Sequence, residues 1–245
     1  MTIASLAMYP FPTLQSAYDR LWQAVRRRLS FDAPDLDWDV PAIDACRRED
    51  LLLGQTCGWP LVTELAGSVQ VVGTFDSDVE GCVDGTYQSV LISSHRASLD
   101  DLVHRADLTV AANSEDSLSG WISLRAVAAE AGVSFGRVLW TGSHAASVEA
   151  IAAGRADLAS IDAVTWAHLA DQSPVVVGHG MRVPSLPLVT SASTPQARVA
   201  ELRSALARAI DDPAMAATRE ALRIRRFISR DFGDYERLAD LAPLG

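Results

Sequence analysis

The sequence predicts an α/β fold, because short apolar segments typical of strands alternate with segments whose apolar residues recur at helical spacing. An apolar run at residues 108–112 precedes a helical pattern at 120–131, which Gly132 ends. A second apolar run at 138–140 precedes a helical pattern that stops at Gly154. The 245 residues, 49% of them hydrophobic, are enough for one large domain or two smaller lobes.

The first part of the chain predicts an opening strand and helix, followed by a second strand and a loop rich in small residues. Tyr9 stands at the carboxyl end of the first strand, and Trp59 stands in the loop after the second strand. Each aromatic side chain either packs within the protein or contacts a ligand. The expected elements are strands at 2–8, 50–54, 69–75 and 87–93 and helices at 14–29, 43–48 and 60–66.

The remainder predicts further alternation and a helical tail. Residues 178–182 suggest a flexible turn, and the arginines at 223, 225, 226 and 230 suggest a solvated face. Phe227, Phe232 and Tyr235 are expected to dock the tail. The expected elements are strands at 157–162, 174–177 and 184–190 and helices at 99–103, 163–170, 194–211 and 214–222.

Charge and cysteine content restrict the classes of function. The formal net charge is −10, and all 21 basic residues are Arg, which argues against binding to nucleic acid or to an anionic membrane. An anion site must therefore depend on local amides, hydroxyls and a single His or Arg. Cys46, Cys57 and Cys82 match no zinc pattern and cannot all pair, so neither a metal site, nor a cofactor, nor a disulfide framework is expected.

The segment Ser117-Leu118-Ser119-Gly120 joins the strand at 108–112 to the following helix. The first turn of a helix has unpaired N–H groups and partial positive charge, so serine hydroxyls beside it favour an oxyanion. The alternative is an ordinary helix cap, a role that serine often has.

A second segment of this kind follows the next strand. Gly142-Ser143-His144 opens another helix, and Asp162 ends the strand after it. The ends of such strands border the ligand crevice in open α/β sheets. We therefore expect Ser143 and His144 to approach the same ligand, with a protonated His144 adding a charge-assisted hydrogen bond. Asp162 is expected to accept a proton-bearing ligand group, and His144 as an ordinary cap remains the alternative.

These segments occur in an order that resembles a known family. Ser117-Leu118-Ser119-Gly120, Gly142-Ser143-His144, the run at 153–162 and Pro184-Ser185-Leu186-Pro187 are similar to motifs of the phosphonate- and phosphate-type substrate-binding proteins of ABC transporters. That family belongs to the type 2 periplasmic binding proteins. The resemblance implies two lobes, each a mixed sheet flanked by helices, with two crossing strands as hinge. Lobe 1 would comprise 1–90 and 191–245, and lobe 2 would comprise 91–190.

The resemblance also implies a function and a partner. The chain is expected to clamp phosphate, phosphite, a phosphonate or a related organic anion between its lobes for uptake through an ABC permease. Leu118 departs from the family pattern, which usually has a hydroxyl residue there, and Ala145 replaces a common acidic residue. Trp121 replaces a small residue or proline, which would narrow the pocket. The implied ligand contacts are Tyr9, Trp59, Ser117, Leu118, Ser119, Gly120, Ser143, His144 and Asp162.

Two other functions share this fold: a cytoplasmic enzyme that uses Cys57, His144 and Asp162, and a ligand sensor. No leader pattern is recognisable, which indicates the cytoplasm, whereas the family resemblance indicates the periplasm. No stretch is long enough for a transmembrane helix. The sequence leaves open whether the chain forms a homodimer.

Overall fold

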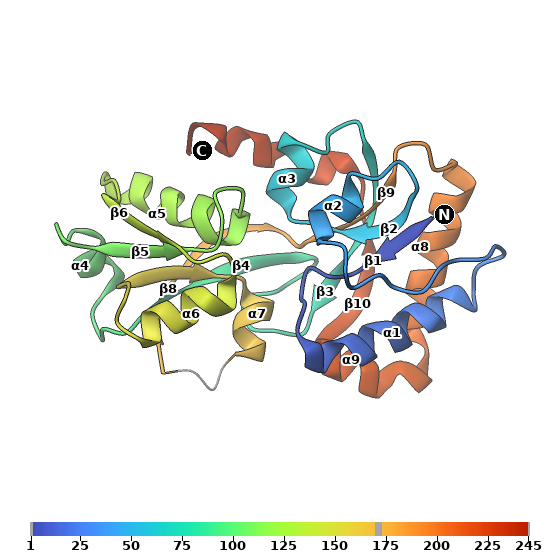
Figure 1. Cartoon of the computed structure of the whole chain (residues 1–245), viewed down its shortest axis with the longest axis horizontal. Helices are drawn as coiled ribbons and strands as arrows, with labels where there is room; N and C mark the ends of the chain where they lie inside the picture. Colours follow the sequence, from blue (N-terminus) through green and yellow to red (C-terminus); the bar gives the residue numbers. More distant parts are fainter. Residues whose placement is uncertain (1, 170–172, 245) are drawn as a thin grey trace. The chain divides into compact units, whose positions relative to one another are not determined.

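The computed structural model describes residues 2–169 and 173–244. It contains two compact units, each with a five-stranded mixed sheet flanked by helices, which confirms the predicted fold class (Figure 1). Unit 1 consists of Met1–Asp78, Val83–Gly85 and Pro184–Arg237, and unit 2 consists of Val79–Cys82, Thr86–Val183 and Leu238–Gly245. The lobe boundaries expected from the sequence stay a prediction.

The sheet of unit 1 has the order β1-β2-β9-β3-β10. Only β1 and β2 are parallel, with Ala4 opposite Leu53, while β9 is antiparallel to β2 and β3, and β10 is antiparallel to β3. Every residue of β2 and β9 is buried, which explains the apolar residues at 51–53 and 188–189 within them. The strands are β1 Ile3–Ser5, β2 Leu51–Gln55, β3 Val69–Ser77, β9 Pro187–Ser191 and β10 Ile224–Ser229.

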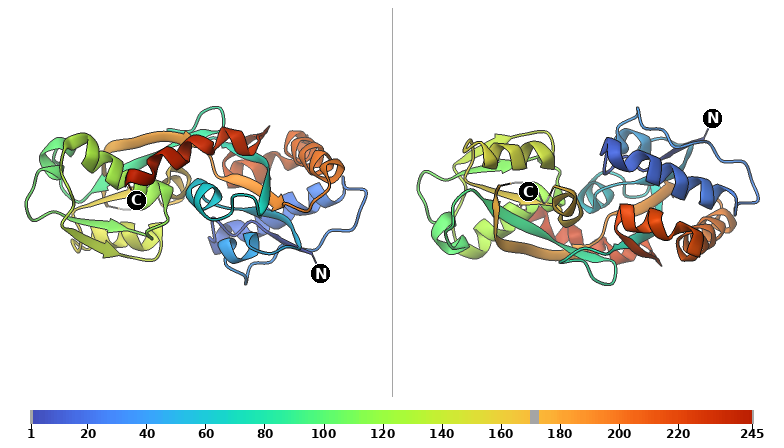
Figure 2. Two further views of the ribbon diagram at one scale, coloured as in Figure 1. Left: turned by 90° about the horizontal axis from the view of Figure 1, so that it is seen from above. Right: turned by 90° about the horizontal axis from the view of Figure 1, so that it is seen from below.

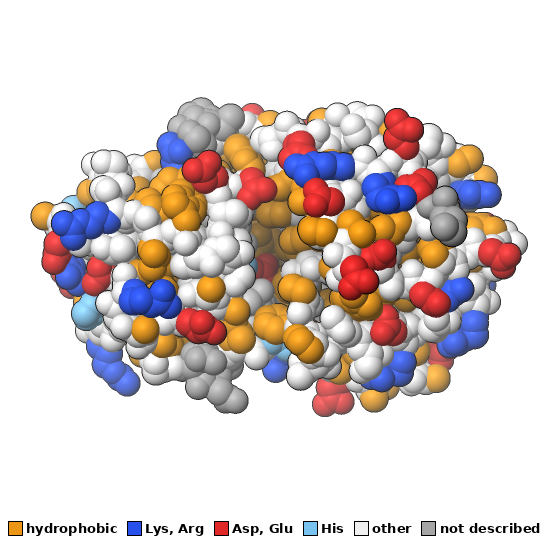
Figure 3. Space-filling view, viewed as in Figure 1, with side chains coloured by type: hydrophobic (Ala, Val, Ile, Leu, Met, Phe, Trp, Pro, Cys, Tyr) orange, Lys and Arg blue, Asp and Glu red, His pale blue; other side chains and the backbone are white. Residues whose placement is uncertain are grey.

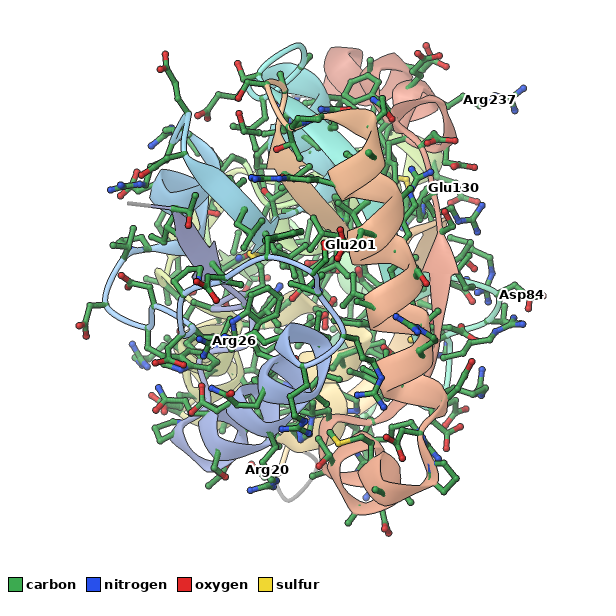
Figure 4. All side chains as sticks on the ribbon, turned by 90° about the vertical axis from the view of Figure 1, so that its right-hand side faces the viewer. Arg20, Arg26, Asp84, Glu130, Glu201 and Arg237 are labelled. Carbon is green, nitrogen blue, oxygen red and sulfur yellow. The ribbon has the colours of Figure 1, made fainter. Side chains whose placement is uncertain are left out.

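The helices of unit 1 bury the apolar stripes that the sequence predicts. In α1, Leu14, Leu21 and Val25 are buried, and α8 lies along the sheet, where it contacts β3 and β10 (Figure 4). The helical elements are α1 Pro12–Arg26, α2 Ala42–Cys46, α3 Gly58–Thr63, α8 Gln196–Asp211, η2 Pro213–Met215, α9 Ala216–Leu222 and η3 Phe232–Asp234, and η4 Glu236–Leu244 follows.

The sheet of unit 2 has the order β6-β5-β7-β4-β8. Strand β5 is parallel to both β6 and β7, and β4 is antiparallel to β7. The carboxyl ends of β5, β6 and β7 therefore lie at one edge of the sheet, which we call the carboxyl edge. The strands are β4 Thr86–Ser93, β5 Thr109–Ala112, β6 Arg137–Trp140, β7 Leu158–Ile161 and β8 Val175–Pro184.

Helices cover both faces of this sheet (Figures 1 and 2). On one face Val148 and Ile151 of α6 pack with Ala111, Ala159 and neighbouring residues. On the other face Leu124 of α5 belongs to a separate cluster with buried residues of β4, β5 and β7. The helical elements are α4 Leu99–Val103, η1 Leu118–Ile122, α5 Ser123–Ala131, α6 His144–Ala152 and α7 Ala163–His168.

One expectation for local structure is wrong, and one strand was not expected. Residues 178–182 form part of β8 and not a turn, and Gly180 lies there because a Cβ would come within 2.3 Å of Ser123 Oγ. The unexpected strand is β10, which contains Arg225 and Arg226. Both side chains are exposed, as the expected solvated face requires, and both also bind the buried carboxylate of Asp76. Burial does support the expected docking of Tyr235, whose hydroxyl donates to Ser185 O at 2.9 Å.

On the face of the molecule that Figure 3 shows, acidic side chains and arginines are interspersed, and neither sign forms a large patch. Among the described helices, none is long and apolar enough to cross a membrane.

Candidate binding site

Three helical segments begin at the carboxyl edge of unit 2, one after each of the parallel strands. Each is capped by the side chain of the residue before it: Ser117, Ser143 and Asp162 accept hydrogen bonds at 2.9 to 3.1 Å from the N–H group three residues later. The capping role that the sequence offered for the Ser117 segment is therefore present, and Ser143 and Asp162 cap their helices in the same way. A serine that accepts in this way still has its hydroxyl proton to donate, so capping does not exclude ligand binding.

Ser119 and His144 meet at this edge although 25 residues separate them. Ser119 Oγ lies 2.8 Å from His144 Nε2, and one residue follows β5 while the other follows β6. Ser119 is 6% exposed and the imidazole is partly buried. The structure thus joins the two segments that the sequence singled out.

A π-helical turn shapes the first of these segments. In η1, the N–H of Ile122 donates to Ser117 O at 3.0 Å, five residues back in the chain. Gly120 is required at the centre of the turn, because a Cβ there would lie 1.9 Å from Asn113 Oδ1 and 2.9 Å from Ser117 Oγ. Such turns are frequent at functional sites, and this one fixes the backbone of Ser119.

Ser160 supports the site from the buried strand β7. Its hydroxyl donates to Ser119 O at 2.6 Å, and its oxygen lies 3.0 Å from Ser123 Oγ. The sequence analysis missed this residue. The signal was a serine at the centre of an otherwise apolar strand, where a hydroxyl needs a partner.

Burial sets the electrostatics of the site. Burial lowers the pKa of His144 to about 4, so the imidazole without a bound anion is neutral at neutral pH, and the protonated form expected against a ligand stays a prediction. At this edge, two buried atoms have no hydrogen-bond partner among the described residues, namely His144 Nδ1 and Asn113 Oδ1. Orphan polar atoms are rare in protein interiors, and here two occur at one edge of a sheet.

The remaining predicted residues occupy different environments. The Leu118 side chain is buried in unit 2 (2% exposed), whereas Tyr9 and Trp59 are buried in unit 1, after the neighbouring parallel strands β1 and β2. Trp121 packs edge to face on Trp140, with ring centroids 5.2 Å apart. The structure leaves the roles of all nine residues in ligand binding as predictions.

Cys57 belongs to unit 1, and His144 and Asp162 belong to unit 2, so no single unit holds the three residues suspected in the enzyme alternative. Within the described chain, no group of three or more His, Cys, Asp or Glu side chains could hold a metal ion.

Comparison with known proteins gives a family match over most of the chain. A family profile described as "ABC transporter, phosphonate, periplasmic substrate-binding protein" matches residues 48–235. A search of curated protein sequences gives no match.

Solved structures share the fold at low sequence identity. PhnD1 from Prochlorococcus marinus, in complex with methylphosphonate, is 15% identical, with a TM-score of 0.82 over 99% of this chain and 97% of that one. A binding protein component of an ABC phosphonate transporter from Pseudomonas aeruginosa is 18% identical, with a TM-score of 0.75 over 99% and 85%. A Xanthomonas citri protein bound to ATP is 16% identical, with a TM-score of 0.70 over 100% and 96%.

Proposed function

Because this chain belongs to the family of periplasmic substrate-binding proteins of phosphonate ABC transporters, we propose that the carboxyl edge of unit 2 binds a small phosphonate- or phosphate-type oxyanion. The bound anion would be delivered to an ABC permease. The observation that carries the proposal is the contact of Ser119 Oγ with His144 Nε2, 2.8 Å apart, at the edge where three helical segments begin.

Oxyanion oxygens need several converging donors, and this edge supplies them. Ser117 and Ser143 accept hydrogen bonds as caps and still have their hydroxyl protons to donate, and first-turn N–H groups beyond those that the caps satisfy add backbone donors. Several such bonds to a charged ligand each contribute about 1.5–3 kcal/mol. Local donors therefore suffice in a protein whose formal net charge is −10.

The organic part of the ligand would be recognised by other residues. Asp162, 3% exposed at the end of β7, would accept from a hydroxyl or amino group of the ligand. Tyr9 and Trp59 would supply apolar contact, as the family resemblance implies. The enzyme and sensor alternatives are not favoured, because the family is one of transport proteins.

The experiment that tests the proposal is isothermal titration of the wild type and of the Ser119→Ala/His144→Ala double variant. The ligands are methylphosphonate, 2-aminoethylphosphonate, phosphate, phosphite and sulfate. We expect the double variant to bind at least ~100-fold more weakly than the wild type, because two hydrogen-bonding groups are lost.

The matched control is Ser98→Ala/His104→Ala in the same unit. Ser98 caps α4, and His104 Nδ1 lies 2.8 Å from Asp100 O, so this variant also loses one serine and one histidine. It should bind like the wild type. A wild type that binds none of the five anions, or a site variant with unchanged affinity, would refute the proposal.

A further inference from the structure

The hydrogen bond between Ser119 and His144 has one proton between its two heavy atoms, and the location of that proton decides what Ser119 can offer a ligand. Nε2 of the ring lies 2.8 Å from Ser119 Oγ, while Nδ1 is buried and has no partner in the described chain. A neutral imidazole carries one proton, on either Nδ1 or Nε2. Two arrangements therefore compete.

In the first arrangement Nδ1 carries the proton. The buried Nδ1–H donor is then unsatisfied, and the Ser119 hydroxyl donates its single proton to Nε2. Ser119 Oγ would then present only lone pairs to the ligand, which repel an anionic oxygen. This arrangement therefore leaves a buried donor unsatisfied and gives Ser119 no proton to donate to an oxyanion.

In the second arrangement Nε2 carries the proton and donates it to Ser119 Oγ. Nδ1 then keeps an unsatisfied lone pair, and under-satisfied acceptors are more common in proteins than orphaned donors. The Ser119 hydroxyl proton becomes available to the ligand. The backbone of Ser119 is already fixed by Ser160, which donates to its carbonyl at 2.6 Å.

We propose, resting on the proposed function, that His144 is a neutral imidazole with its proton on Nε2 and acts as a positioning residue. By donating to Ser119 Oγ it directs the Ser119 hydroxyl proton toward the ligand, and it does not contact the ligand as a cation. The ligand contact that matters is the Ser119 hydroxyl.

The charged groups around the ring are consistent with a neutral imidazole. The acidic residues on the surrounding segments are Asp162 after β7, Glu115 and Asp116 before η1, and Glu149 within α6. Within the described chain none of them forms an ion pair with His144, and burial lowers its pKa to about 4. Arg125, on α5, has its guanidinium 5.6 Å from the centre of the Trp121 ring.

A site with donors but without a cation also favours one class of ligand. Moving a doubly charged anion out of water costs more than moving a singly charged one, and none of the described residues that this site takes from unit 2 carries a positive side chain to offset the difference. Singly charged phosphonates should therefore bind more tightly than doubly charged ones.

The first test reads the tautomer directly and needs no ligand. Long-range ¹H–¹⁵N correlation NMR on the uniformly ¹⁵N-labelled full chain should show His144 with a protonated Nε2 and a bare Nδ1 at about pH 6, unchanged down to about pH 5. The His144→Gln variant identifies the signal by its loss. An imidazolium, or a ring protonated only on Nδ1, would overturn the inference.

The second test separates positioning from charge. His144→Gln keeps an N–H donor without a titrating group, and His144→Leu keeps bulk without a donor. We expect methylphosphonate affinity to fall by no more than about threefold in the first and by at least tenfold in the second. The ratio of wild-type to His144→Gln affinity should stay constant from about pH 5.5 to 8, a comparison that cancels titration of the ligand.

Two results of the second test would contradict the inference. Glutamine and leucine variants with the same loss, or a wild-type advantage that grows as pH falls through about 6.5, would show an imidazolium contact. If the wild type binds no anion at all, the proposed function fails, and the NMR tautomer still decides whether the ring can orient Ser119.

Discussion

Two regions of the molecule bury polar side chains, and they do so in opposite ways. In unit 1 the carboxylate of Asp76 is fully buried, and both of its oxygens accept hydrogen bonds. Arg225 and Arg226 donate to its Oδ2 at 3.1 Å each, and the N–H of Gly85 donates to its Oδ1 at 3.0 Å. In unit 2 Ser119 pairs with His144 without any described ion pair, and His144 Nδ1 and the buried Asn113 Oδ1 have no partner in the described chain.

The comparison distinguishes a structural cluster from a binding site. A buried charge that is fully paired stabilises a particular arrangement of strands, here β3 and β10. Buried polar atoms without partners cost free energy in the folded protein, so natural proteins keep few of them except where a function requires it. The Asp76 cluster is therefore expected to govern stability, and the carboxyl edge of unit 2 is expected to govern affinity.

The pKa of Asp76 shows which effects dominate in the structural cluster. Burial by itself raises the pKa, but hydrogen bonds from Gly85 and Arg226 and the charge of Arg225 outweigh it, so the net pKa is lowered. A carboxyl group with a lowered folded-state pKa stabilises the protein above its unfolded pKa, about 3.9. This stabilisation is lost as pH falls through the folded-state value.

The largest expected change in stability comes from Asp76→Asn. We expect unfolding free energy at pH 7 to fall by about 2–3 kcal/mol, somewhat less than for a fully buried ion pair because both arginines are partly exposed. Urea denaturation measures the change, and the difference from the wild type should begin to shrink as pH falls below about 3.9 and disappear below the lower folded-state pKa of Asp76. Methylphosphonate affinity of the folded protein should stay the same.

Asp84→Asn is the matched control, because Asp84 also pairs with Arg226 but its side chain is 78% exposed and projects from the surface (Figure 4). Its φ of 50° is tolerated by asparagine. This variant should lose less than about 0.5 kcal/mol. Equal losses in the two variants would show that burial of Asp76 has no special role.

Gly120→Ala should affect both stability and affinity. The new Cβ would lie 1.9 Å from Asn113 Oδ1, so either Asn113 or the π-helical turn must move. We expect a loss of about 1–3 kcal/mol in unfolding free energy and at least tenfold weaker binding of methylphosphonate. Denaturation and titration calorimetry measure the two effects.

Gly136→Ala provides the corresponding control within unit 2. No heavy atom lies within 4 Å of the position of its Cβ, and its φ is not in the left-handed region. Stability and affinity should both match the wild type. If Gly120→Ala binds as tightly as Gly136→Ala, the geometry of the turn is not part of the binding site.

The sequence predicted the order of elements and the meeting of two polar segments, because both follow from local rules. Helical spacing located α1 and α8, and serine before a helix located Ser117 and Ser143. Strands that run parallel bring their carboxyl ends to one edge, so Ser119 and His144 could be paired before any coordinates were known.

What the sequence did not predict depends on contacts between distant residues. The charge of His144 is set by burial, and burial depends on how α6 and η1 pack. Strand β10 was missed because arginines interrupt its apolar pattern, and they lie there to neutralise Asp76, about 150 residues earlier. Gly178 and Gly180 resembled turn residues, although they belong to a strand against which Leu99 and Ser123 pack closely.

The smallest expected effects come from two serine caps that differ in location. Ser117 caps η1 at the carboxyl edge, and Ser98 caps α4 elsewhere in unit 2. Each Ser→Ala change removes one bond to a backbone N–H, so each should lower the unfolding free energy by about 0.5–2 kcal/mol, with the buried Ser117 at the upper end.

Affinity should separate the two caps. Only Ser117→Ala also removes a hydroxyl proton beside the proposed ligand, so only this variant should bind methylphosphonate several-fold more weakly in titration calorimetry. Unchanged affinity in both variants would limit Ser117 to its capping role. The oxyanion would then depend on Ser119, Ser143 and backbone donors alone, and the site would extend toward α6 rather than across the start of η1.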